Sequence, residues 1–182
     1  MKSIRIGLLA CLLPTLWLSA CSPDQNWREV TLEGTAFKVQ LPCKPDRAKR
    51  SVVMNNMPAQ LQVVGCESSG SMLAFMTVEL QTGADANALM EGWQKVTLEN
   101  MRADTVGTPV QQQVWHRPGQ LPMKASLRLQ AKGFSANGQA VNIDAVWGAV
   151  ADGDRVRLIH AVVYAPKISP DLANTLFEGL RP

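Results

Sequence analysis

Four cysteines carry the most reactive side chains of this 182-residue chain, and their positions decide which thiol chemistry each can perform. A cysteine sulfur can be acylated, oxidised to a disulfide or bound to a metal ion. Cys11 and Cys21 belong to the N-terminal segment, whereas Cys43 and Cys66 lie in the chain that follows. The residues around each cysteine therefore indicate whether acylation, a disulfide or metal binding is expected there.

The N-terminus has the organisation of a secretory signal. Lys2 and Arg5 give it a positive start, residues 6–18 are mostly apolar, and small residues follow. A membrane-spanning helix needs about 20 apolar residues, so this run is too short to span, and its order of segments is typical of an export signal. Cys11 then leaves with the signal. The alternative is an uncleaved anchor in which Cys21 occurs by chance.

The residues Leu18-Ser19-Ala20-Cys21 resemble the lipobox of a bacterial lipoprotein. The resemblance implies export across the inner membrane, a diacylglycerol on the Cys21 sulfur and cleavage directly before Cys21. Residues 1–20 are then the signal peptide and residues 21–26 a lipidated tether, since two or more acyl chains anchor a protein stably. Ser22 is not the Asp that favours inner-membrane retention in enterobacterial lipoproteins, so the resemblance favours the outer membrane, facing the periplasm.

Cys43 and Cys66 remain in the exported part, and an oxidising compartment makes a disulfide the simplest interpretation of such a pair. They enclose residues 44–65, and chain-entropy models give a crosslink over a loop of that size roughly 3 kcal/mol. The alternative is a metal or redox pair, which the lack of a C-x-x-C spacing and of a second Cys or His cluster disfavours. We therefore expect a disulfide, no metal site and no cofactor.

The charge balance argues against a nucleic-acid partner. The chain has 18 Lys and Arg against 15 Asp and Glu, and loss of the signal's two basic residues leaves 16 against 15. A near-neutral exported domain with one Tyr and four Phe lacks the basic surface of a nucleic-acid-binding protein. One basic cluster remains, formed by Lys44, Arg47, Lys49 and Arg50. We interpret it as a solvated loop, or as a contact for anionic lipid headgroups beside the anchor.

Hydrophobic periodicity predicts the elements that must position these residues. The strands that we expect cover residues 27–32, 37–41, 51–54, 61–64, 72–80, 110–115, 123–131, 141–149 and 155–165. A helical period predicts helices over about 85–101, where Gly92 lets the helix lie close to a sheet, and after Ser169-Pro170. Residues 43–50 are expected to form a loop. This order predicts an α+β class, with one antiparallel β-sheet flanked by two helices in a single domain over residues 27–182.

A two-residue turn at Asp152-Gly153 predicts the register of the last hairpin, in which His160 faces Ala145. His160 then lies on an apolar face that also carries Trp147. We interpret it as a core histidine bonded to Tyr164 or to a backbone carbonyl. The alternative is a general base or a pH-sensitive group.

The opposite face of the same strands is polar. Arg128 and Arg157 lie on it and are possible ligand-binding residues, because a guanidinium can hold a carboxylate or phosphate with two hydrogen bonds. Asp144 could instead neutralise Arg128, and a polar face also arises wherever one side of a sheet meets water. The sequence has no nucleophile-elbow, zinc-protease, phosphate-loop or dinucleotide motif, so we predict no catalytic residue.

Residues 37–45 (F-K-V-Q-L-P-C-K-P) resemble the F-x-V-x-x-P-x-x-P opening of small exported bacterial proteins with a PsbP-like α+β sandwich. The resemblance covers about residues 27–181 and implies an antiparallel sheet flanked by helices. That fold serves as binding or assembly modules, and the resemblance carries over no catalytic residue.

Together these features predict a non-enzymatic lipoprotein of the cell envelope. It would bind or support another periplasmic or membrane component, with the membrane and an envelope protein as its partners. The alternative is a periplasmic carrier of a small amphipathic ligand held between sheet and helix near Trp93 and Trp147, and an enzyme is a further alternative. A structure without an apolar pocket at that place would remove the carrier hypothesis.

Overall fold

The computed structural model describes residues 25–103 and 107–181. The lipobox-like residues 18–21, with the expected lipidation site Cys21, lie outside the described residues. The described elements are β1 (Arg28–Thr31), β2 (Lys38–Leu41), β3 (Asp46–Met54), β4 (Met57–Ser68), β5 (Ser71–Glu79), α1 (Ala86–Asn100), β6 (Gln111–Val114), β7 (Gln120–Leu121), β8 (Leu127–Phe134), β9 (Ala140–Asp152), β10 (Arg155–Ala165) and α2 (Pro170–Glu178).

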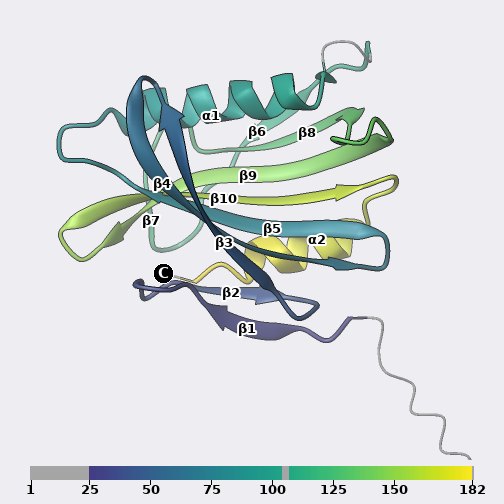
Figure 1. The fold of residues 1–182 in the computed structure, drawn as a ribbon, viewed down its shortest axis with the longest axis horizontal. Helices are drawn as coiled ribbons and strands as arrows, with labels where there is room; N and C mark the ends of the chain where they lie inside the picture. The colour runs from purple at the N-terminus through teal and green to yellow at the C-terminus, as the bar shows by residue number, and fades with distance from the viewer. Residues whose placement is uncertain (1–24, 104–106, 182) are drawn as a thin grey trace, which may run out of the picture.

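Eight of these strands form one antiparallel sheet in the order β3-β4-β5-β10-β9-β8-β6, with β7 paired to β9. α1 covers one face of this sheet, while α2 and the separate β1–β2 hairpin cover the other (Figure 1). Each face has its own cluster of buried apolar side chains, with Phe177 on the α2 side and Trp147 on the α1 side. The predicted α+β class, an antiparallel sheet with two helices, is confirmed.

Both helices begin close to the predicted residues. The Asp85 carboxylate accepts a hydrogen bond of 3.1 Å from the N–H of Ala88 and so caps α1. Ser169 precedes α2, but its side chain makes no capping hydrogen bond. Pro170, whose fixed φ suits the first turn, and the acidic Asp171 favour the start of this helix instead.

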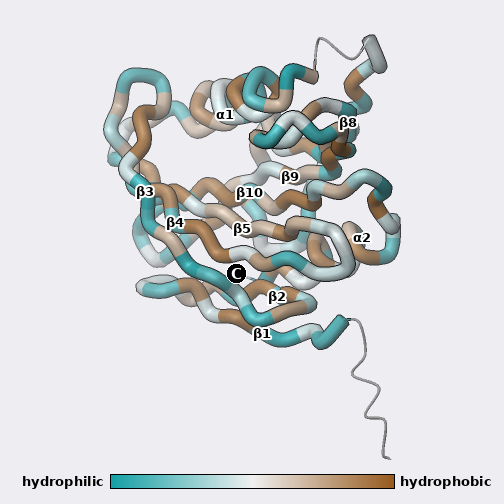
Figure 2. The backbone as a smooth tube through the Cα atoms, turned by 45° about the vertical axis from the view of Figure 1, so that its right-hand side comes forward, coloured by the Kyte–Doolittle hydropathy of each residue, from teal (hydrophilic) through white to brown (hydrophobic). Residues whose placement is uncertain are grey.

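The predicted loop over residues 43–50 is wrong for most of its length, because this segment forms the first half of β3. β3 is an edge strand, and Figure 2 shows a hydrophilic stretch along it. Arg47 donates from Nη1 to the Thr31 carbonyl at 3.0 Å, and Lys49 forms an ion pair of 2.8 Å with Glu33. Charged side chains are common on edge strands because they oppose the addition of another strand. A run of charges therefore does not exclude a strand at this position.

The last hairpin turns one residue later than predicted, at Gly153-Asp154. Gly153 has a φ of 68°, which is the positive value required at the first central position of a type II′ turn. His160 consequently pairs with Trp147 and not with Ala145. Because side chains alternate with a period of two, this shift of two residues leaves every side chain on its predicted face.

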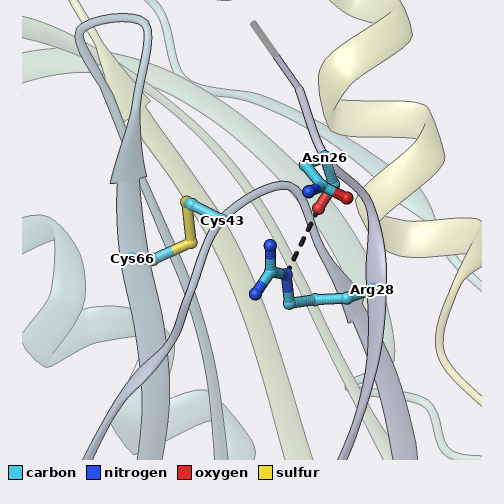
Figure 3. Close-up of a disulfide and its surroundings, with 4 residues drawn as sticks. All are labelled: Asn26, Arg28, Cys43 and Cys66. Carbon is cyan, nitrogen blue, oxygen red and sulfur yellow. Dashed lines mark hydrogen bonds between the residues drawn. A yellow bond between two sulfur atoms is a disulfide. The ribbon is translucent and has the colours of Figure 1, made fainter. Parts of the chain in front are cut away.

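A disulfide joins the two sheets. Cys43, two residues after the end of β2, is bonded to Cys66 in β4, and their Cα atoms lie 5.9 Å apart (Figure 3). The predicted disulfide is therefore confirmed, although Cys66 lies within a longer strand than expected. The described chain enters beside it, where Arg28 donates from Nε to the Asn26 carbonyl at 3.4 Å.

Candidate ligand pocket

A cavity of about 780 Å³ lies between α1 and the sheet. α1 forms its roof, β5 and β10 contribute the floor, and the β3–β4 hairpin forms one wall. Residues 134–141, around the turn between β8 and β9, line its far end. Sites for small molecules have volumes of roughly 300–1,000 Å³, so this cavity is large enough for such a ligand.

The β3–β4 hairpin is held against α1 by its tip (Figure 1). Asn55 and Asn56 form the two-residue turn, with φ values of 47° and 64°, and the Asn55 side-chain amide donates to the Ala88 carbonyl at 3.0 Å. A Cβ on Gly92 would lie 2.7 Å from Oδ1 of Asn55. Gly92 therefore makes room for the hairpin tip, whereas the sequence suggested a close approach of helix and sheet.

His160 lies at the floor of the cavity between two indole rings. Its ring is stacked on Trp147, with 4.2 Å between centroids and 9° between planes, and meets Trp93 edge-on at 5.2 Å. Nδ1 lies 3.1 Å from the Val146 carbonyl oxygen, and because that oxygen only accepts, Nδ1 carries the proton. Burial lowers the pKa of His160 to about 4, against the smaller opposing effect of this hydrogen bond. The imidazole is therefore neutral at physiological pH.

The second ring nitrogen of His160, Nε2, is left as a hydrogen-bond acceptor without a partner among the described residues. No carboxylate is hydrogen-bonded to this histidine in the same part of the chain. The arrangement therefore matches a buried histidine bonded to a backbone carbonyl and lacks the acid that would orient a general base.

Tyr164 lines the same cavity, four residues further along β10 and on the same face as His160. Burial raises the pKa of Tyr164 to about 12, so its phenol stays protonated. Within residues 25–103 and 107–181 its hydroxyl has no hydrogen-bond partner. The cavity thus contains two uncharged polar groups with unused hydrogen-bonding capacity.

The rim of the cavity is apolar and exposed. Val53, Met72 and Val96 are 74%, 40% and 50% exposed, and all three line the cavity. Only one other large apolar side chain in the described part of the chain, Val114 on β6, is comparably exposed. Exposed apolar surface is therefore concentrated around this cavity, and a concentration of this kind marks a binding site.

Charge is almost absent from the same surface. Glu67 on β4 is the one charged side chain among the described lining residues, and no Lys or Arg is among them. The remaining polar lining comes from hydroxyl and amide side chains, including Ser71, Asn100 and Gln139. The lining is therefore compatible with an uncharged or largely apolar occupant.

Arg128, a predicted ligand-binding residue, lies on the opposite face of the sheet. Its Nε and Nη2 donate to the two carboxylate oxygens of Asp144 at 2.8 and 2.6 Å, as the cross-strand alternative anticipated. Its Nη1 donates to the Asn174 side chain on α2 at 2.9 Å, and the guanidinium lies 5.0 Å from the ring centroid of Phe177. Arg128 therefore connects the sheet to α2.

Arg157, the other predicted ligand-binding residue, is buried on the same face as Arg128. Its Nε donates to Asp152 at 2.9 Å, and its Nη2 lies 3.1 Å from a carboxylate oxygen of Glu79. The structure shows no contact between the two arginines, and each is held by carboxylates of the chain itself. The polar face is also not simply solvated, because α2 and the β1–β2 hairpin cover it (Figure 1).

No protein-family model matches the chain, and no curated protein is significantly similar to it in sequence. Within residues 25–103 and 107–181, no three His, Cys, Asp or Glu side chains are grouped so that they could hold a metal ion. No helix in this part of the chain is both long and apolar enough to cross a membrane.

The carrier hypothesis predicts a ligand near Trp93 and Trp147. Trp93 lines the cavity, whereas Trp147 does not. Trp147 is fully buried beneath His160. The exposed rim was missed because its members come from β3, β5 and α1, which the sequence does not connect. One signal was present, since Met72 begins a strand that is apolar on both faces.

Proposed function

We propose that this protein is a lipid-anchored binding protein of the cell envelope whose cavity under α1 takes a small amphipathic molecule. The observation that carries the proposal is the cavity of about 780 Å³ with its exposed apolar rim. Exposure of Val53, Met72 and Val96 to water is unfavourable at about 25 cal/mol per Å² of apolar surface, and an apolar ligand removes that cost. This favours the carrier hypothesis over the support of an envelope protein.

The shape of the cavity supports a small molecule over a protein surface. A roof, a floor and a hairpin wall enclose it, whereas protein interfaces are larger and flatter. Met54, Met72, Met76 and Met101 are among its lining residues. Methionine side chains are flexible and polarisable, so walls of this kind adapt to acyl chains of differing shape.

Binding is favoured over catalysis by the environment of the titratable groups. His160 is neutral, bonded to a backbone carbonyl and enclosed by Trp93 and Trp147. A general base needs a reacting proton within reach and usually a second group that orients it. No side chain among the described residues is hydrogen-bonded to His160 so as to orient it.

The first described residues and the cavity lie on opposite sides of the sheet (Figure 1). The described chain begins at the β1–β2 hairpin, where the Asn26 N–H donates to the Pro42 carbonyl at 2.9 Å, and α1 covers the other face (Figure 1). A lipid on Cys21 would then hold the hairpin side towards the membrane and leave the cavity towards the periplasm. Residues 37–45, which carry the resemblance to PsbP-like proteins, belong to the hairpin layer and do not line the cavity. The resemblance is therefore compatible with a binding role for the other face.

Native mass spectrometry of the full-length protein, purified from its own membranes in mild detergent, tests the proposal. We expect a chain that begins at Cys21 and carries lipid, together with a small molecule that is released on denaturation. Val96→Asp should abolish retention of that molecule, because a carboxylate at the rim is incompatible with an apolar ligand.

Val114→Asp is the matched control, since Val114 is also exposed but lies on β6 outside the cavity. It should leave ligand retention unchanged. A wild-type protein that retains no small molecule, and that binds none when incubated with envelope lipids, would contradict the proposal. A retained protein in place of a small molecule would return the assembly hypothesis to first place.

A further inference from the structure

The charges around the cavity restrict the head group of its ligand. Glu67 is the charged lining side chain, and neither Lys nor Arg lines the described part of the cavity. A carboxylate or phosphate that leaves water needs a cation or several hydrogen-bond donors to replace its hydration. The cavity supplies no cation to an anionic head group, and Glu67 repels it.

The hydrogen-bonding groups on the floor of the cavity also favour an uncharged head group over an anionic one. Nδ1 of His160 already donates to Val146, so the ring can offer a ligand only the acceptor Nε2. A carboxylate only accepts hydrogen bonds and cannot bond to that nitrogen, whereas a hydroxyl can donate to it. The Tyr164 hydroxyl both donates and accepts, and it also matches a ligand hydroxyl.

These two groups lie along one strand. His160 and Tyr164 are four residues apart on β10, which corresponds to about 13 Å between their Cα atoms. Neither Nε2 nor the phenol is hydrogen-bonded to another described residue, and neither is among the fully buried unpaired polar atoms, so both are accessible from the cavity. An uncharged ligand with a hydroxyl group would satisfy one of them and leave its apolar body against the methionine walls.

We propose that the cavity selects an uncharged amphipathic lipid that carries a hydroxyl group, such as a long-chain alcohol or an acylglycerol, over the corresponding free fatty acid. This inference rests on the proposed function and names the ligand class of the same cavity. It assigns Glu67 and Tyr164 as residues that determine specificity.

Displacement of the uncharged fluorescent probe phenylnaphthylamine from the full-length protein tests the inference. The competitors are dodecanol, dodecanoate, dodecyl chloride and dodecyltrimethylammonium, which share one alkyl chain. They are used at neutral pH and low salt, the two ionic compounds below their micelle concentrations and the two uncharged ones below their solubility limits. We expect dodecanol to bind about tenfold more tightly than dodecanoate, because repulsion by one charge near a protein surface is of that order.

Two variants identify the residues responsible. Glu67→Lys should strengthen dodecanoate binding about tenfold and leave dodecanol unchanged, whereas Glu178→Lys, an equal charge change on the opposite face, should alter neither. Tyr164→Phe should weaken dodecanol about threefold to tenfold, the loss expected for one hydrogen bond, and leave dodecyl chloride unchanged. Unchanged circular dichroism and thermal unfolding would show that each variant is folded.

The possible failures are distinguishable. If the probe does not bind saturably and no competitor acts, both this inference and the proposed function are overturned. If all competitors act equally and Glu67→Lys changes nothing, the inference is overturned and the proposed function stands. Tightest binding of dodecyltrimethylammonium would overturn the inference in favour of a cationic ligand attracted by Glu67.

Discussion

The two faces of the large sheet differ in how completely the chain covers them. On the α2 face, Phe75 and Phe177 are fully buried, and the disulfide holds the β1–β2 hairpin in place. On the α1 face, Val53, Met72 and Val96 remain exposed around a cavity of about 780 Å³. The α2 face is therefore the more completely covered, with a smaller cavity of about 340 Å³ beside Asp144 and Ile168, and the α1 face is the more open. The α2 face is thus the more closely packed of the two, and the α1 face carries the proposed binding site.

Polar groups are divided in the same way. The part-buried charge of Arg128 and the buried charge of Arg157 lie on the α2 face, where carboxylates of the chain neutralise them. On the α1 face, His160 and Tyr164 are uncharged, and each keeps hydrogen-bonding capacity unused within the described chain. The α1 face therefore offers hydrogen-bonding groups to a ligand, whereas the two cations of the α2 face are held by carboxylates of the chain.

The largest expected effect tests the difference in packing. Phe177→Ala on α2 should lower the free energy of unfolding by about 3–5 kcal/mol, since it leaves a cavity in a fully covered core. Val96→Ala at the open rim should change it by less than about 0.5 kcal/mol. Urea unfolding of both variants measures the difference, and equal losses at the two positions would contradict the division between the faces.

Removal of the cation that neutralises the buried Asp144 tests the paired charges. Arg128→Ala should cost about 3 kcal/mol, because it leaves the 2%-exposed Asp144 with the Gln130 amide, 2.7 Å away, as its remaining partner. The double variant Arg128→Ala with Asp144→Ala should recover part of this loss in the same urea titration. Lys95→Ala, which removes one partner of an exposed pair on α1, is the control and should cost less than about 1 kcal/mol.

Acid should lower the free energy of unfolding through His160, which lies on the α1 face. The folded pKa of about 4 lies below the ordinary value of 6.5, so the unfolded chain binds the proton first as the pH falls. The stability from the neutral ring is complete above pH 6.5 and is lost towards pH 4, by up to about 3 kcal/mol. The measurement is the free energy of unfolding between these pH values. His160→Phe should remove this part of the slope, and His116→Gln, at an exposed histidine, should retain it.

The smallest expected effect concerns the hairpin wall. An alanine in a helix interior normally stabilises it by about 1 kcal/mol over glycine, but in Gly92→Ala the new Cβ would lie 2.7 Å from Asn55 Oδ1. We expect Gly92→Ala alone to give no net gain in thermal stability. In an Asn55→Gly background, where glycine suits the φ of 47°, the same change should restore the gain. A full gain in the single variant would show that the hairpin tip moves freely.

Much of the fold could be predicted because the relevant signals are local. Alternation and helical period place His160 and Trp147 on one face and identify both helices, and turn residues locate the hairpins. The exact register was beyond these signals, since Asp152-Gly153 and Gly153-Asp154 are both plausible turns and only the backbone conformation separates them. The strand predicted over residues 51–54 is shorter than β3 for a related reason, because the charges of β3 are compatible with either a loop or an exposed edge strand.

The sequence by itself determined which side chains share a face and which cysteines form the disulfide. Side-chain direction follows the period of the element, and Cys43 and Cys66 were the cysteines left in the expected exported part. Only the tertiary structure decided which face is open. Val53 and Val96 meet at one rim because β3 and α1 dock beside each other, and that contact depends on long-range packing that no local pattern encodes.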